Sequence, residues 1–430
     1  MHLGDITIDN MSKVYGHAGL DINIRNNKVK SVQINLTESS RFFETLVRNK
    51  KFDQVSSIAS RICGICSPSH NVTSVMAVEN ALGVEPSEQT KKLRELFVCG
   101  GYVQSHSLHS YFLALPDYLG YNSILDMAGD YKADVERALR LKKLGNEIAA
   151  CISGRDVHAA TTIVGGFTSL PTKEKLNNLL KSLKKGKADA MKTAKLFASL
   201  KKPQFERKRN FVALHHNDEY AILFGKVCNG NEHMQPKNYR GRLSLENRSY
   251  STSKFVKFDK KEFMVGPLAR INTNHKNLST DAKAAIKIMK LEIPSHSPFS
   301  SNLARVAELV HCIDRSIEII KNIKLKEERA FDFSKMKNKR NHYEGCAVTE
   351  APRGVLYHSY KINMKGIITG ADIITPTAKN LLSIENDIRQ FVPAILKKPR
   401  DKIIIELEKL VRSYDPCLSC STHFLEVNFL

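Results

Sequence analysis

The sequence predicts an α+β fold that is mainly α-helical, with small sheets at its periphery. Long segments place apolar residues at helical spacing, and two short segments alternate apolar and polar residues as strands do. The composition, 42% hydrophobic and 26% charged, is typical of a globular protein. The helical patterns cover approximately residues 86–113, 131–150, 302–325 and 400–412, together with a lysine-rich run that follows Thr172.

The strand patterns lie close together near the N-terminus. Residues 20–24 and 32–36 each alternate apolar and polar side chains, and the polar segment 25–28 between them is typical of a turn. We therefore expect a β-hairpin over residues 18–37. A second, polar region at 211–260 contains the strand-like piece 221–224.

Several helical patterns have residues at their ends that commonly begin or end helices. Pro86 opens the first pattern, which we expect Gly100-Gly101 to interrupt. Gly154 follows the second pattern, and Thr172 is a suitable N-cap for the lysine-rich helix. Pro416 ends the last pattern just before a pair of cysteines.

The chain of 430 residues is long enough for a large core, and no repeat or low-complexity linker divides it, so we expect one domain over residues 1–430. No apolar run approaches the length of a membrane helix, and the first residues lack a signal-peptide pattern. Nine cysteines, an odd number, argue against a disulfide framework. These observations favour a cytoplasmic protein with no direct membrane span.

The net charge of +22 is concentrated in one segment. Residues 173–209 hold thirteen Lys or Arg against three Asp or Glu, with leucines at helical spacing between them. Two interpretations stay open: a solvated helix face, or a docking surface for an acidic partner or nucleic acid. No aromatic residues interleave the lysines as stacking platforms, so charge alone does not indicate nucleic-acid binding.

Two Cys-x-x-Cys motifs near opposite ends of the chain are the most specific signal. Each is closely followed by a histidine: Cys63, Cys66 and His70 in 61–70, and Cys417, Cys420 and His423 in 415–423. Two such pairs supply four thiolates, enough to fill a soft-metal site.

The distance between the motifs narrows the choice of site. Alone, each pair also fits a structural zinc site or a redox pair, but local zinc sites usually place the second pair about 15–20 residues after the first. Here 351 positions separate Cys66 from Cys417. A shared site therefore requires the two ends to meet inside one fold, which is feasible because loop-closure entropy grows only logarithmically with length.

The residues around both pairs resemble the two signatures of nickel–iron hydrogenase large subunits. The first motif contributes Arg61 and Gly64, and the second contributes Asp415 and Pro416, besides the cysteines and histidines. The resemblance runs from about residue 4 to 423. The stretch 376–380 and the flanks of both motifs look most like the cytoplasmic multisubunit enzymes, which couple hydrogen to NAD(P), to the deazaflavin F420 or to other soluble acceptors.

The resemblance implies a complete set of metal ligands and partners. Cys63 and Cys417 would be terminal nickel ligands, and Cys66 and Cys420 would bridge nickel to an iron that carries CO and CN. Cys417 would accept the proton from hydrogen. Electrons would pass to a separate iron–sulfur small subunit, then to a diaphorase or other electron-transfer subunit, since the chain lacks spare cysteines in cluster spacing. A maturation endopeptidase and nickel chaperones would assist assembly.

The resemblance also assigns residues around the metals. His70 would hydrogen-bond a bridging sulfur. Arg353, in the stretch 349–354, would face the open metal position, held by Asp117 and Asp415. Segment 154–158 would pack near the site without ligating it.

Two residues match a further cation site. Glu44 and His423 would bind Mg or a second Fe near the C-terminus. The alternative for Glu44 is a plain surface helix residue.

The chain departs from the family pattern at two places. Tyr15, in 13–17, occupies the position of the glutamate that carries protons away from the terminal thiolate. A phenol with a pKa near 10 is a poorer carrier than a carboxylate near 4.3, so we expect a slowed or rerouted proton exit. Residues 424–430 follow the last histidine and match either a short precursor tail or a retained end.

The leading functional hypothesis is reversible heterolytic cleavage of H2 by the catalytic subunit of a hydrogenase. A hydrogen sensor or impaired homologue is the main alternative, because of Tyr15. A respiratory-complex subunit descended from this family would have lost the cysteines, and a basic zinc protein would bind nucleic acid instead.

Overall fold

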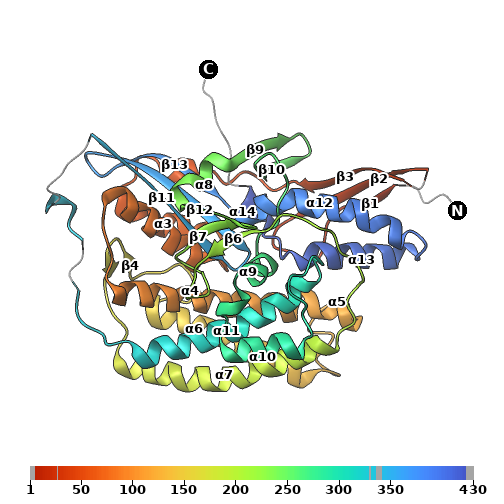
Figure 1. The fold of residues 1–430 in the computed structure, drawn as a ribbon, viewed down its shortest axis with the longest axis horizontal. Helices are drawn as coiled ribbons and strands as arrows, with labels where there is room; N and C mark the ends of the chain where they lie inside the picture. The colour runs from red at the N-terminus through yellow and green to blue at the C-terminus, as the bar shows by residue number, and fades with distance from the viewer. Residues whose placement is uncertain (1–4, 27, 329–330, 336–340, 423–430) are drawn as a thin grey trace.

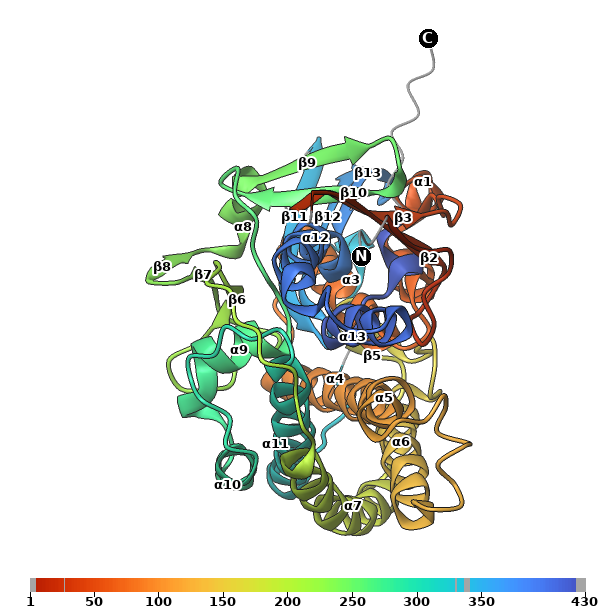
Figure 2. The same ribbon diagram turned by 90° about the vertical axis from the view of Figure 1, so that its right-hand side faces the viewer.

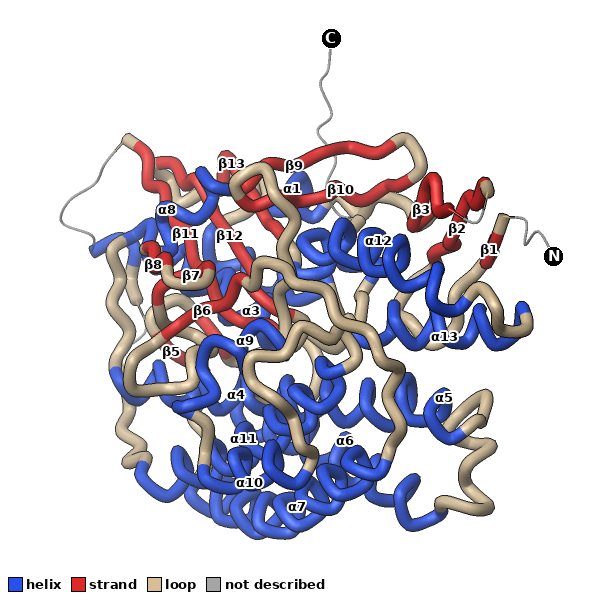
Figure 3. Tube along the Cα trace, turned by 45° about the vertical axis from the view of Figure 1, so that its right-hand side comes forward, coloured by secondary structure: helices blue, strands red, loops and turns tan. Residues whose placement is uncertain are grey.

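The structure is a computed structural model that describes residues 5–26, 28–328, 331–335 and 341–422. Figure 1 shows two layers: long helices below, and the sheets with further helices above. In Figure 3 the strands gather in the upper half of the molecule, while helices fill the lower half. The prediction of a mainly helical α+β fold is confirmed.

The lower layer is a group of long helices that pack side by side, as Figure 2 shows nearly end-on. Its members are α4 Glu88–Leu108, α6 Lys132–Ser153, α7 Lys173–Ser199, α10 Thr280–Ile288 and α11 Ser300–Asn322. The predicted boundary residues are confirmed at two places: α6 ends at Gly154 with φ 76°, and the Thr172 side chain accepts a hydrogen bond from the Lys175 N–H at 3.2 Å. Leucines of α7 face the core, and its lysines lie outside.

The prediction that Gly100-Gly101 interrupts the first helix is wrong, because α4 runs through both glycines. The glycines allow α4 and α6 to approach closely instead. A Cβ on Gly145 of α6 would lie 2.4 Å from the backbone nitrogen of Gln104, and a Cβ on Gly100 would lie 2.9 Å from Ile148. Such spacing is possible only without side chains at the crossing.

The upper layer is built around a three-stranded antiparallel sheet covered by one helix. The sheet contains β11 His342–Ala351, β12 Gly354–Asn363 and β13 Ile368–Ile374, and α3 Ser67–Leu82 packs on it. Two further helices, α12 Pro376–Ile395 and α13 Arg400–Ser413, lie beside each other near the N-terminal strands (Figure 1).

The smaller sheets lie around this centre. Their strands are β1 Ile6–Ile8, β2 Ala18–Arg25 and β3 Lys28–Leu36; β4 Thr162–Ile163 and β5 Gly166–Phe167; β6 Val212–His215, β7 Lys226–Asn229 and β8 Glu232–Met234; β9 Leu243–Arg248 and β10 Ser251–Phe258. The predicted hairpin over 18–37 is confirmed as β2 and β3. The strand-like piece 221–224 is not a strand: it is a largely buried loop, and Ile222 O accepts the Glu350 N–H at the end of β11.

Short helices complete the connections and carry several site residues. They are α1 Phe43–Val47, α2 Val55–Ala59, α5 Leu115–Leu119, α8 Pro236–Tyr239, α9 Pro267–Asn274 and α14 Leu418–Ser421. Single helical turns are η1 Phe52–Gln54, η2 Ser60–Ile62, η4 Arg240–Arg242, η5 His275–Asn277 and η6 Phe333–Lys335, and a π-helical turn, η3 His109–Ala114, joins α4 to α5. Within the described residues, no helix is both long and apolar enough to cross a membrane.

Candidate metal centre

The four cysteines of the two motifs come together in one buried cluster. The sulfurs of Cys63 and Cys417 lie 3.9 Å apart, and those of Cys63, Cys417 and Cys420 all lie within 4.8 Å of one another. Each of the four residues is at most 7% exposed. A metal–sulfur bond is about 2.3 Å long, so two sulfurs 3.9 Å apart can ligate one ion. The predicted meeting of the chain's two ends is present in the structure.

Cys66 is the fourth cysteine of this cluster. Its backbone N–H donates to the Cys63 sulfur at 3.1 Å, and its own sulfur accepts a hydrogen bond from Arg353 at 2.7 Å. Hydrogen bonding from Cys66 lowers the pKa of Cys63 to about 6, so the pair readily holds one thiolate. Cys417 and Cys420 are bonded as a disulfide in the structure, and four-thiolate ligation requires this bond to be reduced.

Each motif begins a helix, and backbone contacts hold the second motif against other parts of the chain. Cys66 is the N-cap of α3, so the first pair lies at the N-terminus of the helix that packs on the central sheet. Cys417 is the N-cap of α14, and its N–H donates to the Thr377 hydroxyl at 3.0 Å. The next N–H, of Leu418, donates to the carbonyl of Tyr15 at 2.7 Å, which joins the N-terminal segment directly to the second motif.

Arg353 stands at the turn between β11 and β12 and points at the sulfurs. Its guanidinium contacts the Cys66 sulfur, and it donates to the Asp415 carbonyl at 2.8 Å and to the Asp415 carboxylate at 3.1 Å. Arg353 and Asp415 are 2% and 1% exposed, so the ion pair lies in a low-dielectric interior. The predicted partnership of Arg353 with Asp415 is therefore present.

Asp117 has different partners from those we predicted. Its carboxylate, at the start of α5, forms ion pairs with Lys13 and Arg412. The expectation that Asp117 binds Arg353 is therefore wrong. The sequence does not indicate which cation an aspartate in this position will meet. In the structure Asp117 pairs with Lys13 and with Arg412, at the end of α13.

Tyr15 lies against the same arginine. The Arg353 guanidinium carbon is 4.6 Å from the centre of the Tyr15 ring, a cation–π distance. Burial raises the pKa of the phenol further above its ordinary value. Within the described part of the chain, the Tyr15 hydroxyl has no hydrogen-bond partner.

His70 begins a line of buried polar side chains on α3 and β12. Its Nδ1 lies 3.1 Å from Nε2 of His358, and Nδ1 of His358 lies 2.7 Å from the Tyr360 hydroxyl. Sequence reasoning missed His358 and Tyr360, because nothing in a strand pattern marks a buried polar pair. The hydrogen bond expected from His70 to a bridging sulfur, that of Cys66 or Cys420, stays a prediction.

Glu44 and segment 154–158 both lie close to the cysteine motifs. Phe43, beside Glu44, packs in the same cluster as the four cysteines and Ile373. Glu44 Oε1 accepts the Ile373 N–H at 2.7 Å, and burial raises the pKa of its carboxyl to about 7. Its predicted partner His423 lies outside the described residues. His158 packs on the first motif, and its backbone N–H donates to the Ser67 hydroxyl at 3.1 Å.

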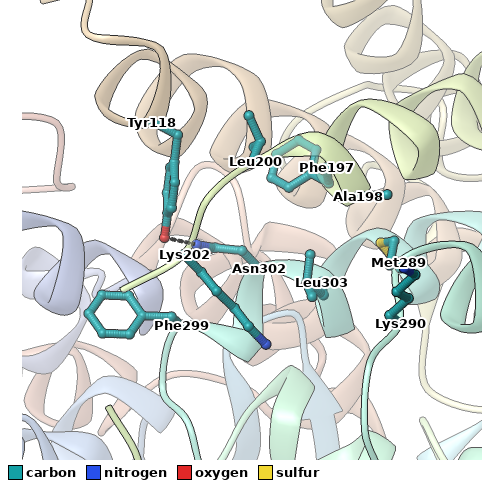
Figure 4. Close-up of a pocket in the computed structure, with 10 residues that line it drawn as sticks. All are labelled: Tyr118, Phe197, Ala198, Leu200, Lys202, Met289, Lys290, Phe299, Asn302 and Leu303. Atoms are coloured by element: carbon teal, nitrogen blue, oxygen red, sulfur yellow. Dashed lines mark hydrogen bonds between the residues drawn. The ribbon is translucent and has the colours of Figure 1, made fainter. Parts of the chain in front are cut away.

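The pocket drawn in Figure 4 is separate from the cysteine cluster. It is a cavity of about 210 Å³ between α5, α7 and α11, lined by Phe197, Leu200, Phe299 and Leu303, and Asn302 donates to the Tyr118 hydroxyl there at 3.2 Å. None of its lining residues is a predicted site residue.

Comparisons with known proteins give the family. The family model for nickel-dependent hydrogenase matches residues 41–138 and 222–423, more than half of the chain. The alpha chain of sulfhydrogenase 1 from Pyrococcus furiosus is 35% identical over 427 residues, covering 98% of both chains. The corresponding polypeptide of the vhu F420-non-reducing hydrogenase from Methanocaldococcus jannaschii is 30% identical and covers 92% of this chain and all of that protein.

Solved structures agree on the fold. An NAD+-reducing NiFe hydrogenase in its H2-reduced state superposes with a TM-score of 0.87 at 23% identity, covering 98% of this chain and all of that one. The NiFeSe hydrogenase of Dm. baculatum gives a TM-score of 0.79 at 23% identity, covering 97% and 99%. The family match and the clustered cysteines lead to one conclusion: this chain belongs to the nickel-dependent hydrogenase family, as the catalytic large subunit of a nickel–iron hydrogenase that cleaves H2.

Proposed function

We propose that Cys63, Cys66, Cys417 and Cys420 together hold a nickel–iron centre whose iron carries CO and CN. The observation that carries the proposal is the convergence of four buried sulfurs with one buried arginine. Thiolates are soft ligands that suit nickel and iron and are poor ligands for Mg or Ca. When bound, the centre supplies a redox-active pair of metals at which H2 is split heterolytically.

The surrounding residues give the proposed site its chemistry. Arg353 is permanently charged and donates a hydrogen bond to the Cys66 sulfur, so it stabilises negative charge on the thiolates and on diatomic ligands. Asp415 fixes the guanidinium from the opposite side. With the centre bound, the Cys417 sulfur would accept the proton, and His70 would orient a neighbouring thiolate. Burial of the whole cluster excludes water from these atoms.

Proton exit is the step at which we expect this chain to differ. Tyr15 stands beside the second motif in the position of the family's carrier glutamate. Its hydroxyl lacks a partner among the described residues, so it offers no onward path. Proton exit is therefore slowed or follows another route. This observation also supports the second candidate function, a hydrogen sensor that keeps the centre and turns over slowly.

The proposed partners follow from the kind of site. A chain without a cluster motif of its own passes electrons to an iron–sulfur small subunit. The relatives named above are components of a sulfhydrogenase and of an F420-non-reducing hydrogenase. We place this chain in a comparable cytoplasmic complex with a diaphorase or other electron-transfer subunit, matured by an endopeptidase and nickel chaperones. Glu44 with His423 would bind Mg or a second Fe.

The test is metal analysis and infrared spectroscopy of the purified complex. We expect nickel and iron, with infrared bands of metal-bound CO and CN. Cys63→Ser should remove nickel and the bands, whereas Cys151→Ser, at a half-buried cysteine on α6, should keep both. Zinc without nickel would refute the proposal. Turnover with an artificial dye separates the enzyme from the sensor, since a sensor should show the bands with little turnover.

A further inference from the structure

A second buried arginine grips the turn that carries Arg353. Arg270, in α9, donates to the carbonyl of Ala351 at 2.9 Å and to the carbonyl of Pro352 at 2.8 Å. These two residues directly precede Arg353 in the turn between β11 and β12. The Arg270 side chain therefore fixes the path by which the backbone enters Arg353.

Two carboxylates fix the orientation of Arg270 itself. Its Nε and Nη2 donate to Glu308 at 2.6 and 2.7 Å, and its Nη1 donates to Glu350 at 2.9 Å. With the two carbonyls, these bonds use all five N–H groups of the guanidinium. All three residues have a relative exposure of 0%. A lysine has its donors on a single nitrogen and cannot span these four groups.

On the side of the turn away from Arg270, the backbone of Gly266 packs closely against Arg353 and Gly354. Gly354 has φ 130°, and a Cβ there would lie 2.7 Å from the backbone nitrogen of Gly266. A Cβ on Gly266 would in turn lie 3.0 Å from the Arg353 carbonyl. The turn is thus held between Arg270 and the 265–266 backbone, and a change on either side has to move Arg353.

We propose that Arg270 is a positioning residue for Arg353. By holding the two carbonyls before it, Arg270 places the Arg353 guanidinium on the Cys66 sulfur and against Asp415. This inference rests on the proposed function, in which Arg353 acts at the metal centre. A purely structural Arg270 would instead affect the stability of the protein and leave the centre unchanged.

The test compares Arg270→Lys with a matched control in the purified hydrogenase complex. Arg94→Lys is the control, because Arg94 forms a comparable buried, two-bond pair with Glu79 between α3 and α4. Arg270→Lys should lower dye-linked H2 oxidation about 10- to 100-fold, since small displacements of a site group have effects of this size. It should also shift the CO and CN infrared bands and speed amide hydrogen exchange over residues 347–358. Arg94→Lys should keep the wild-type bands and turnover.

Arg353→Lys and the double variant separate this inference from the proposed function. If Arg270 acts through Arg353, the double variant should be no slower than Arg353→Lys alone, a non-additive result. Loss of turnover in Arg353→Lys, with normal turnover, bands and exchange in Arg270→Lys, would overturn the positioning role and keep the proposed function. Full turnover in Arg353→Lys would show that Arg353 has no role at the centre and would overturn the positioning role of Arg270, whereas the proposed function would be overturned only by the absence of nickel and of the CO and CN bands from the wild-type complex.

A second variant covers the case in which Arg270→Lys does not fold. Glu308→Gln removes one of the bonds that orient Arg270 and should shift the bands and speed exchange over 347–358 in the same direction, by a smaller amount. Wild-type bands and exchange in this variant would overturn the inference.

Discussion

Replacing Tyr15 with phenylalanine tests whether its hydroxyl has a role. The hydroxyl is buried and has no partner among the described residues, while the ring packs against Arg353. An unpaired buried hydroxyl costs roughly 1–3 kcal/mol, and phenylalanine removes this cost while keeping the cation–π contact. Tyr15→Phe should therefore raise the free energy of unfolding by about 1 kcal/mol.

The same substitution should leave proton transfer unchanged. A hydroxyl with no onward partner cannot relay a proton, so the rate of H/D exchange between H2 and D2O should match that of the wild type. Tyr15→Glu, which places a carboxylate beside the second motif, should increase that rate. Tyr15→Ala is the packing control and should destabilise the protein by about 2–4 kcal/mol, less than a fully buried aromatic residue because Tyr15 is partly exposed.

The assays are denaturant unfolding and mass-spectrometric H/D exchange on the purified complex. A tenfold or greater fall in exchange in Tyr15→Phe, a change of about 1.4 kcal/mol in the barrier, would refute the reasoning and assign the relay to the phenol. Lower stability of Tyr15→Phe would show that the hydroxyl has a partner.

Three further predictions concern the frame around the site. Gly145→Ala brings a methyl to within 2.4 Å of the Gln104 backbone nitrogen and should destabilise the protein by about 1–3 kcal/mol in denaturant unfolding, whereas Gly129→Ala, with open space around it, should not. Burial raises the pKa of Glu385 to about 7, so the folded state binds a proton that the unfolded state releases; stability should fall as pH rises from about 4.5 to 7, and Glu385→Gln should flatten this slope in unfolding measured across pH. Thr172→Ala should cost about 1 kcal/mol by removing the cap of α7, and an unchanged unfolding midpoint would contradict this.

Patterns in the sequence predicted those elements whose two faces differ. The hairpin 18–37 and helices α6, α7 and α13 each have a regular apolar side, so their spacing reveals them. Helix α3 escaped prediction because it is buried on nearly every side, with small polar residues such as Ser69 and Thr73 facing the interior. Such a helix has no polar face and therefore no periodic signal.

The candidate site also has a part that the sequence predicts and a part that it does not. Motif spacing and resemblance predicted that Cys63 and Cys66 would meet Cys417 and Cys420. Partners of single charged residues were not predictable, because Arg270 finds its carboxylates 38 and 80 positions away. For the same reason Asp117 was assigned to the wrong arginine. A sequence shows which groups need a partner, and only the fold decides which partner they meet.

The hydrogen bond between Leu418 and Tyr15 has a consequence for biosynthesis. Translation delivers Cys63 and Cys66 early, but half of the ligand set is missing until 351 more positions have been read. The proposed four-cysteine site can be completed only when this late segment docks on the early one, through contacts such as the Leu418–Tyr15 hydrogen bond.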